Sequence, residues 1–173
     1  MKKEVTAAEL GKMIRGLELK RMQLLEKEEK CSVFNCAASE EENIEALRPE
    51  YDFDETQREL HGIEDSIVTC KHLLNRFNAT TVVGDTGLTV DQVLVRLPQL
   101  SREVEKLKRM SSRMERERIE ARYGADFIDY TVANYDIDKV QKAYEQKAAK
   151  LTEYQLALDK TNMDNTITIE IEE

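Results

Sequence analysis

The feature that most constrains this chain is a seven-residue repeat of mostly apolar residues that three separate segments share. Residues spaced alternately three and four apart lie on one side of a helix, so each repeat lines a stripe that can face a partner helix. In the second predicted helix the stripe comprises Phe53, Thr56, Leu60, Ile63, Ile67, Cys70, Leu74 and Phe77. In the third it comprises Val90, Val93, Leu97, Leu100, Val104, Leu107, Ser111 and Met114. In the fourth it comprises Ile137, Val140, Tyr144, Lys147, Leu151, Tyr154, Leu158 and Thr161.

Short polar residues stand where these helices should begin, because their side chains can accept hydrogen bonds from the free backbone N–H groups of a first turn. The capping pairs are Thr6 with Glu9, Asp52 with Glu55 and Thr89 with Gln92, and Asp136 precedes the last helix. We predict a mainly α protein with four long helices at about 6–31, 52–78, 89–122 and 136–162, in antiparallel, coiled-coil-like packing.

The first predicted helix is apolar on two sides. Leu10, Met13, Leu17 and Leu24 form its stripe, whereas Leu19 and Met22 lie on the opposite side. A helix with two apolar sides favours two partners, which predicts contact with a second copy of the chain.

The connections between the helices differ in character. Residues 32–50 form an acidic linker, within a single domain that spans 1–173. Three segments have the composition that is typical of strands, with β-branched or aromatic residues or an alternation of polar and apolar ones. They lie at about 79–83, 126–133 and 166–171. Because isolated strands are unstable in water, we expect the three to meet in one small sheet near one end of the bundle.

Charge and composition exclude several classes of function. The formal net charge is −9, so the chain should repel nucleic acid and anionic membranes. No apolar run is long enough to span a bilayer and no secretory signal is visible, which predicts a cytoplasmic protein. Three cysteines and two histidines lack the spacing of a metal site, and no catalytic arrangement stands out. We therefore expect no cofactor, no metal and no enzymatic activity.

Several short motifs resemble the septicolysin-like family, a group of small helical proteins from bacteria and phages. They are Asn75 to Thr81, Gly87-Leu88-Thr89, the stretch from Arg122-Tyr123 to Asp136-Ile137, Leu158-Asp159, Asn162 and Thr166. The resemblance covers most of the chain. It implies a helical fold and self-association, in a family with no firmly established enzyme activity.

The most ligand-like stretch combines arginines with aromatic residues after the basic half of the third predicted helix. Arg118 would fall on the apolar stripe, where a guanidinium is costly without an acceptor. Arginine binds phosphate with two parallel bonds and aromatic rings stack on bases, so an anionic, nucleotide-derived ligand is expected. The candidate site residues are Arg76, Asn78, Thr80, Arg118, Arg122, Tyr123, Tyr130, Tyr135 and Asn162.

Two functions remain open at this point. In the first, a non-enzymatic homo-oligomer sequesters a small phosphorylated or nucleotide-like signalling ligand in pockets at subunit junctions. In the second, the protein is a coiled-coil scaffold in which the arginines pair only with neighbouring glutamates. Membrane lysis is disfavoured, because the chain is acidic and lacks a basic amphipathic helix.

Overall fold

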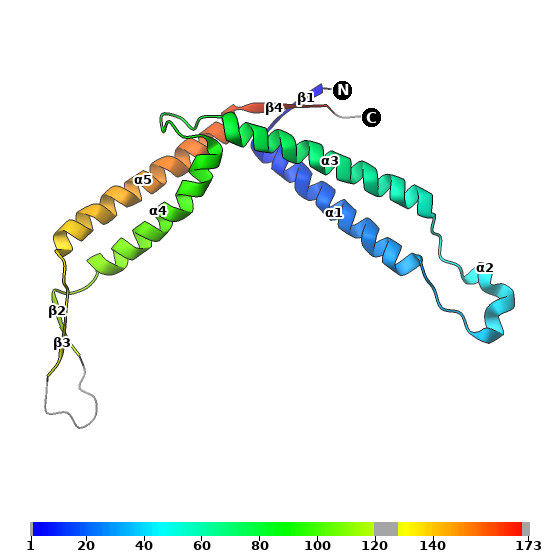
Figure 1. Cartoon of the computed structure of the whole chain (residues 1–173), viewed down its shortest axis with the longest axis horizontal. Coiled ribbons are helices and arrows are strands. Elements are labelled where there is room, and N and C mark those ends of the chain that lie inside the picture. Colours follow the sequence, from blue (N-terminus) through cyan, green and yellow to red (C-terminus); the bar gives the residue numbers. More distant parts are fainter. Residues whose placement is uncertain (1, 120–127, 171–173) are drawn as a thin grey trace. The chain divides into compact units, whose positions relative to one another are not determined.

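The computed structural model describes residues 2–119 and 128–170, apart from the side chains of residues 40–42. Its elements are β1 (Lys2–Thr6), α1 (Ala7–Cys31), a 3₁₀ turn (Ala38–Asn43), α2 (Ile44–Leu47), α3 (Phe53–Thr80), α4 (Val90–Ser111), β2 (Arg116–Arg118), β3 (Tyr130–Val132), α5 (Ile137–Asp164) and β4 (Thr166–Glu170) (Figure 1). The predicted mainly α class with a small β component is confirmed.

The chain forms two compact units. Unit 1 consists of residues 1–78 and 162–173, and unit 2 consists of residues 79–161. The single domain expected from the sequence stays a prediction. In the part of the chain that the structure describes, no helix is long and apolar enough to cross a membrane.

The predicted helix starts are confirmed by their side-chain caps. Thr6 and Glu9 form a complete capping box at α1, and Thr89 and Gln92 form another at α4. Asp52 accepts from the backbone N–H of Glu55 at α3. Asp136 does the same for Lys139 at α5, and this bond holds the pKa of its carboxyl below the usual value. Each bond satisfies a donor that the first turn leaves unpaired, so short local motifs fix where the helices begin.

Unit 1 is an antiparallel pair of helices, α1 and α3, with a strand pair at one end. Ion pairs join Lys71 to Glu18 and Arg21 to Glu64, both at 2.7 Å, along the two helices. β1 pairs antiparallel with β4, with Lys2 opposite Glu170 and Thr6 opposite Thr166. The strand pair supplies three apolar residues to the core and the helices supply the others. The core residues are Val5, Ala7, Leu10, Ile14, Leu60, Cys70, Phe77, Ile167 and Ile169.

Unit 2 contains a second antiparallel helix pair, α4 and α5. A tight turn precedes α4, in which Gly84 and Gly87 have φ of +44° and +69°. These angles lie in the left-handed region that favours glycine. The turn places the side chain of Val83 in the core, where it is fully buried. The core of this unit also contains Val90, Val93, Leu100, Tyr154 and Leu158. Lys147 of α5 pairs with Glu103 of α4 further along.

The third predicted helix ends much earlier than expected. The helix predicted over 89–122 stops at Ser111, and Arg116–Arg118 form a strand. The hydroxyl groups of Ser111 and Ser112 donate to the carbonyl oxygens of Lys108 and Arg109, and this competes with continued helix formation. Strand pairing then satisfies the backbone beyond, so tertiary contacts override the helical preference of this Arg- and Glu-rich stretch.

The predicted single sheet is wrong. β4 pairs with β1 in unit 1, whereas β3 pairs with β2 in unit 2. The expected strand at 79–83 is reduced to one bridge between Val82 and Thr89, because α3 continues to Thr80. Residues 126 and 127, at the start of another predicted strand, lie outside the described residues. Both true partner strands are short and charged, and strand preference alone does not reveal such segments.

The seven-residue stripes lie on the less exposed sides of α3, α4 and α5, although coiled-coil packing itself stays a prediction. Leu60 and Leu100 are buried, while Ile67, Leu107 and Leu151 are half-buried. Phe53 and Met114, at the ends of their stripes, are exposed.

Leu100→Ala should destabilise the protein more than the same change elsewhere on the stripe. Leu100 has no exposed surface, so we expect its truncation to cost about 2–5 kcal/mol of unfolding free energy. Leu107→Ala should cost less, and Leu156→Ala, whose side chain is 65% exposed, should stay within about 0.5 kcal/mol of the parent. An equal loss of unfolding free energy for Leu100→Ala and Leu156→Ala, measured by chemical denaturation, would contradict this packing.

The Glu103–Lys147 pair should make part of the stability depend on pH. The hydrogen bond from Lys147 holds the pKa of Glu103 below its usual 4.5. A lowered pKa in the folded state contributes stability above the usual value, and this contribution is lost as pH falls through the folded value. The melting temperature of the parent should therefore exceed that of Glu103→Gln near neutral pH, and the two should converge in acid. Glu105→Gln is the control, and a gap that persists in acid would contradict the assignment.

Candidate ligand-binding site

Beyond the end of α4, strands β2 and β3 form a hairpin, hereafter the β2–β3 hairpin, that carries two of the predicted arginine and tyrosine residues (Figure 1). Arg116 lies opposite Val132, Glu117 opposite Thr131, and Arg118 opposite Tyr130. The side chains of all six are exposed. A two-stranded hairpin buries little surface by itself, which leaves these side chains available for a ligand or partner.

Strand alternation sorts the side chains of the hairpin by charge. Residues opposite each other, or two apart, lie on the same face of a sheet. One face, here called the basic face, therefore holds Arg116, Arg118, Tyr130 and Val132. Glu117 and Thr131 lie on the other face. The guanidinium of Arg116 lies 3.6 Å from the centre of the Tyr130 ring, a close cation–π contact.

Within the described residues, no glutamate forms an ion pair with an arginine of the basic face. The ion pairs there do not involve Arg116 or Arg118. Two guanidinium groups beside an aromatic ring can bind a phosphate through parallel N–H bonds and stack on a planar group.

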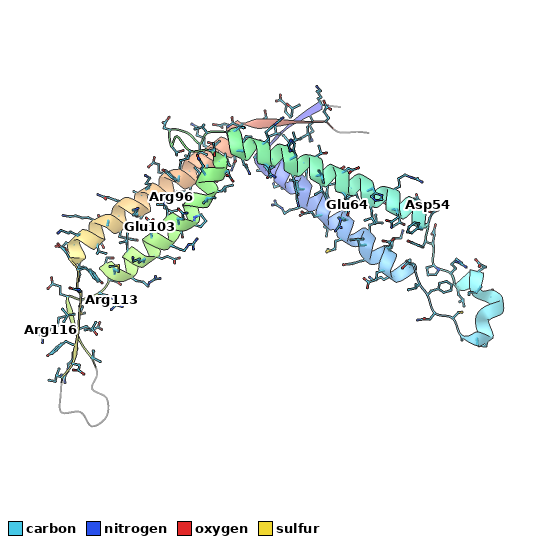
Figure 2. The ribbon with its side chains drawn as sticks, viewed as in Figure 1. Asp54, Glu64, Arg96, Glu103, Arg113 and Arg116 are labelled. Carbon is cyan, nitrogen blue, oxygen red and sulfur yellow. The ribbon has the colours of Figure 1, made fainter. Side chains whose placement is uncertain are left out.

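A hollow of about 310 Å³ lies where the hairpin joins the end of α4. It is lined by Met110, Arg113, Met114, Glu117, Thr131, Val132, Ala133, Asn134 and Tyr135. Arg113 and Arg116 lie in this region of the chain, beyond α4 (Figure 2). The Tyr135 hydroxyl donates to the carbonyl oxygen of Met110 at 3.0 Å, and so satisfies one of the terminal acceptors of α4. Tyr135 thus has a structural role in addition to the predicted contact with a ligand.

The other predicted site residues lie elsewhere. Arg76, Asn78 and Asn162 are near the ends of α3 and α5 and belong to unit 1. Thr80 is in unit 2, close in sequence to the start of α4, where Val90 donates to the carbonyl oxygen of Thr81. The 22 residues of α4 rise about 33 Å, which separates this end from the β2–β3 hairpin. Within unit 2, Thr80 and Arg118 therefore do not share a pocket.

Arg122 and Tyr123 lie outside the described residues. Arg118 does not interrupt a helical stripe, because α4 ends before it, so the argument from its position on that stripe is wrong. Arg118 stays a candidate for a different reason, namely its place on the basic face.

Sequence reasoning missed Arg116 and Arg113 as site residues, although both belong to the basic cluster, which is the stretch rich in lysine and arginine between residues 102 and 118. The alternation Arg116-Glu117-Arg118 has a period of two, which indicates a strand with its charges separated by face. In the part of the chain that the structure describes, no group of three or more histidine, cysteine or acidic residues has the geometry to hold a metal ion.

Comparison with known proteins supports the fold and leaves the function open. No family model matches the sequence, and the curated proteins contain no match. The resemblance to the septicolysin-like family therefore stays a prediction. A solved structure from Corynebacterium diphtheriae, described as a functionally unknown conserved protein, superposes with a TM-score of 0.59. It shares 15% identity and covers 95% of this chain and 99% of its own. At this identity the likeness concerns the fold alone.

Tyr135→Phe should weaken the protein by about 0.5–1.5 kcal/mol, because it removes a single hydrogen bond to the end of α4. Tyr130→Phe, at an exposed position on the hairpin, should leave the unfolding free energy nearly unchanged. Chemical denaturation measures both. An equal effect of the two variants would show that the Tyr135 hydroxyl does not hold this end of α4.

Proposed function

We propose that this protein is a non-enzymatic, homo-oligomeric binding protein that sequesters a small anionic, nucleotide-derived ligand at subunit junctions. The observation that carries the proposal is the basic face of the β2–β3 hairpin, where Arg116 stacks on Tyr130 and Arg118 lies directly opposite the same residue. A phosphate and a planar base are the two chemical groups that such an arrangement recognises together.

The acidic net charge does not oppose binding at this place. Charges beyond about 8 Å are screened at physiological salt, so a ligand responds mainly to its neighbours. In the sequence, Lys108, Arg109 and Arg113 precede the hairpin together with Glu115, and the hairpin itself carries two further arginines. Glu117, the nearest acidic residue in the strands, projects from the opposite face.

Exposed apolar side chains support self-association. Leu19 and Met22 on α1 are each 50% exposed, as expected for a helix with a second apolar side. A second group surrounds the hairpin, where Met114, Ile119, Ile128 and Val132 are exposed. Apolar residues beside a basic face suit a ligand site that a second copy helps to enclose.

The second candidate function is a structural scaffold without a small ligand. It is favoured by the long paired helices and by the Tyr135 hydroxyl, which serves the end of α4. In a scaffold, the arginines of the basic face would keep the hairpin hydrated and would not distinguish among anions. A binding measurement separates the two functions.

Calorimetric titration of cyclic nucleotides and ADP-ribose-type nucleotides into the protein tests the proposal. We expect at least one phosphorylated compound to bind, and Arg118→Ala to weaken it about tenfold or more, because bonds to charged groups contribute about 1.5–3 kcal/mol each. Arg102→Ala is the matched control, since it removes the same charge from the exposed side of α4. Titration of inorganic phosphate tests recognition of the phosphate alone, and titration of an unphosphorylated nucleoside tests recognition of the base without it. Absence of binding across the panel, or an equal loss of affinity in both variants, would contradict the proposal and favour the scaffold function.

A further inference from the structure

We infer that two copies of the chain associate by pairing their β3 strands, so that the two hairpins form one four-stranded antiparallel sheet about a two-fold axis. This inference deepens the proposed function by naming the partner and the surface that complete the basic face. It is carried by the hydrogen-bond pattern of the hairpin and by the residues on its two outer edges.

The pattern of backbone bonds shows which groups point outward. Ile119 donates to the carbonyl oxygen of Asp129, and Ala133 donates to that of Glu115, both at 2.9 Å. In an antiparallel pair, opposed residues alternate between those that bond each other and those that do not. Glu117 and Thr131 therefore bond each other within the hairpin.

The residues between these pairs direct their backbone groups to the outer edges. On β3 they are Tyr130 and Val132, and on β2 they are Arg116 and Arg118. Within the described residues, no strand pairs with either outer edge. Unpaired backbone groups on an exposed edge are a template for another strand.

A two-fold pairing of β3 with itself satisfies this edge without conflict. With Thr131 opposite its own copy, Tyr130 lies opposite Val132 of the second copy, and both have outward-facing backbone groups. The facing side chains are then aromatic with β-branched, and threonine with threonine, which are favourable pairs across strands. Tyr130 is 42% exposed and Val132 is 63% exposed, so both gain burial by pairing.

The same operation on β2 is unfavourable. Arg116 would lie opposite Arg118 of the second copy, and Glu117 would lie opposite its own copy. Every facing pair would then carry like charges, which destabilises a sheet. The β2 edge is therefore protected against further strand addition, and the assembly closes at two copies through this contact.

The symmetric sheet joins the two basic faces on one side. Because the two-fold axis is perpendicular to the sheet, the basic faces of both copies lie on the same side. Because the β3 strands pair with each other, the tyrosines lie in the two central strands and the arginines in the two outer strands. With strands about 4.8 Å apart, the two rows of arginines are separated by about 14 Å. A ligand that extends over the central tyrosines can then contact guanidinium groups from both copies.

A matched pair of proline variants tests which edge is used. Val132→Pro removes an outward N–H from β3 and Arg116→Pro removes one from β2, at cross-strand positions of the same hairpin. Light scattering should show that Val132→Pro halves the mass of the parent assembly, built from chains of 20.0 kDa, whereas Arg116→Pro retains it. The same mass for both proline variants would overturn the inference.

A cross-link provides a second measurement that does not depend on proline. Directly opposed, non-bonded residues of antiparallel strands have Cα atoms about 4.5 Å apart, which a disulfide can span. In a chain with Cys31, Cys36 and Cys70 replaced, Thr131→Cys should form a covalent dimer on mild oxidation, and Glu117→Cys should not. No cross-link at Thr131, or equal cross-linking at both positions, would overturn the inference. A cross-link without any binding in the titration would instead refute the proposed ligand and leave the interface intact.

Discussion

The whole structure depends on the burial of one narrow apolar stripe between each pair of helices. A helix pair has no third element above or below it, so few residues can be fully enclosed. The most deeply buried side chains are Leu10 in unit 1 and Val83, Val93 and Leu100 in unit 2, and they lie in the half of each helix pair that carries an additional cover. In unit 1 the cover is the β1–β4 pair, and in unit 2 it is the turn that seats Val83. Further along, Leu24 and Leu107 are only half-buried, and exposed ion pairs contribute little.

At the ends of the helix pairs that lie farthest from these covers, apolar surface therefore stays available for other contacts. In unit 2 this end carries the β2–β3 hairpin, with Met114 and Val132 exposed beside the hollow. A weak core is thus the physical reason that self-association is expected at this place. The exposed Leu19 and Met22 of α1 provide a separate apolar surface within unit 1.

How much of this could be predicted from the sequence depends on how local the determining interaction is. Helix starts were predictable because Thr6, Asp52, Thr89 and Asp136 bond backbone groups only three residues away. Strand partners were not, because Lys2 pairs with Glu170 across nearly the whole chain and neither residue type favours strands. Of the candidate site, the Arg and Tyr composition was predictable. Its geometry was not, because the helical repeat was extended through Arg116 to Arg118 where the backbone is a strand.

The change from helix to strand at this point also determines what the basic cluster can do. On a helix, Glu120 would follow Arg116 by four residues and Glu115 would precede Arg118 by three, and such neighbours pair with one another in water. On a strand, alternate residues point to opposite faces, so the arginines share one face and Glu117 points to the other. The same sequence therefore gives a neutralised surface in one conformation and a concentrated cationic surface in the other. Since β3 places Tyr130 directly across from Arg118, only the strand conformation puts two arginines and an aromatic ring on one face, which the proposed recognition of a phosphate and a base requires.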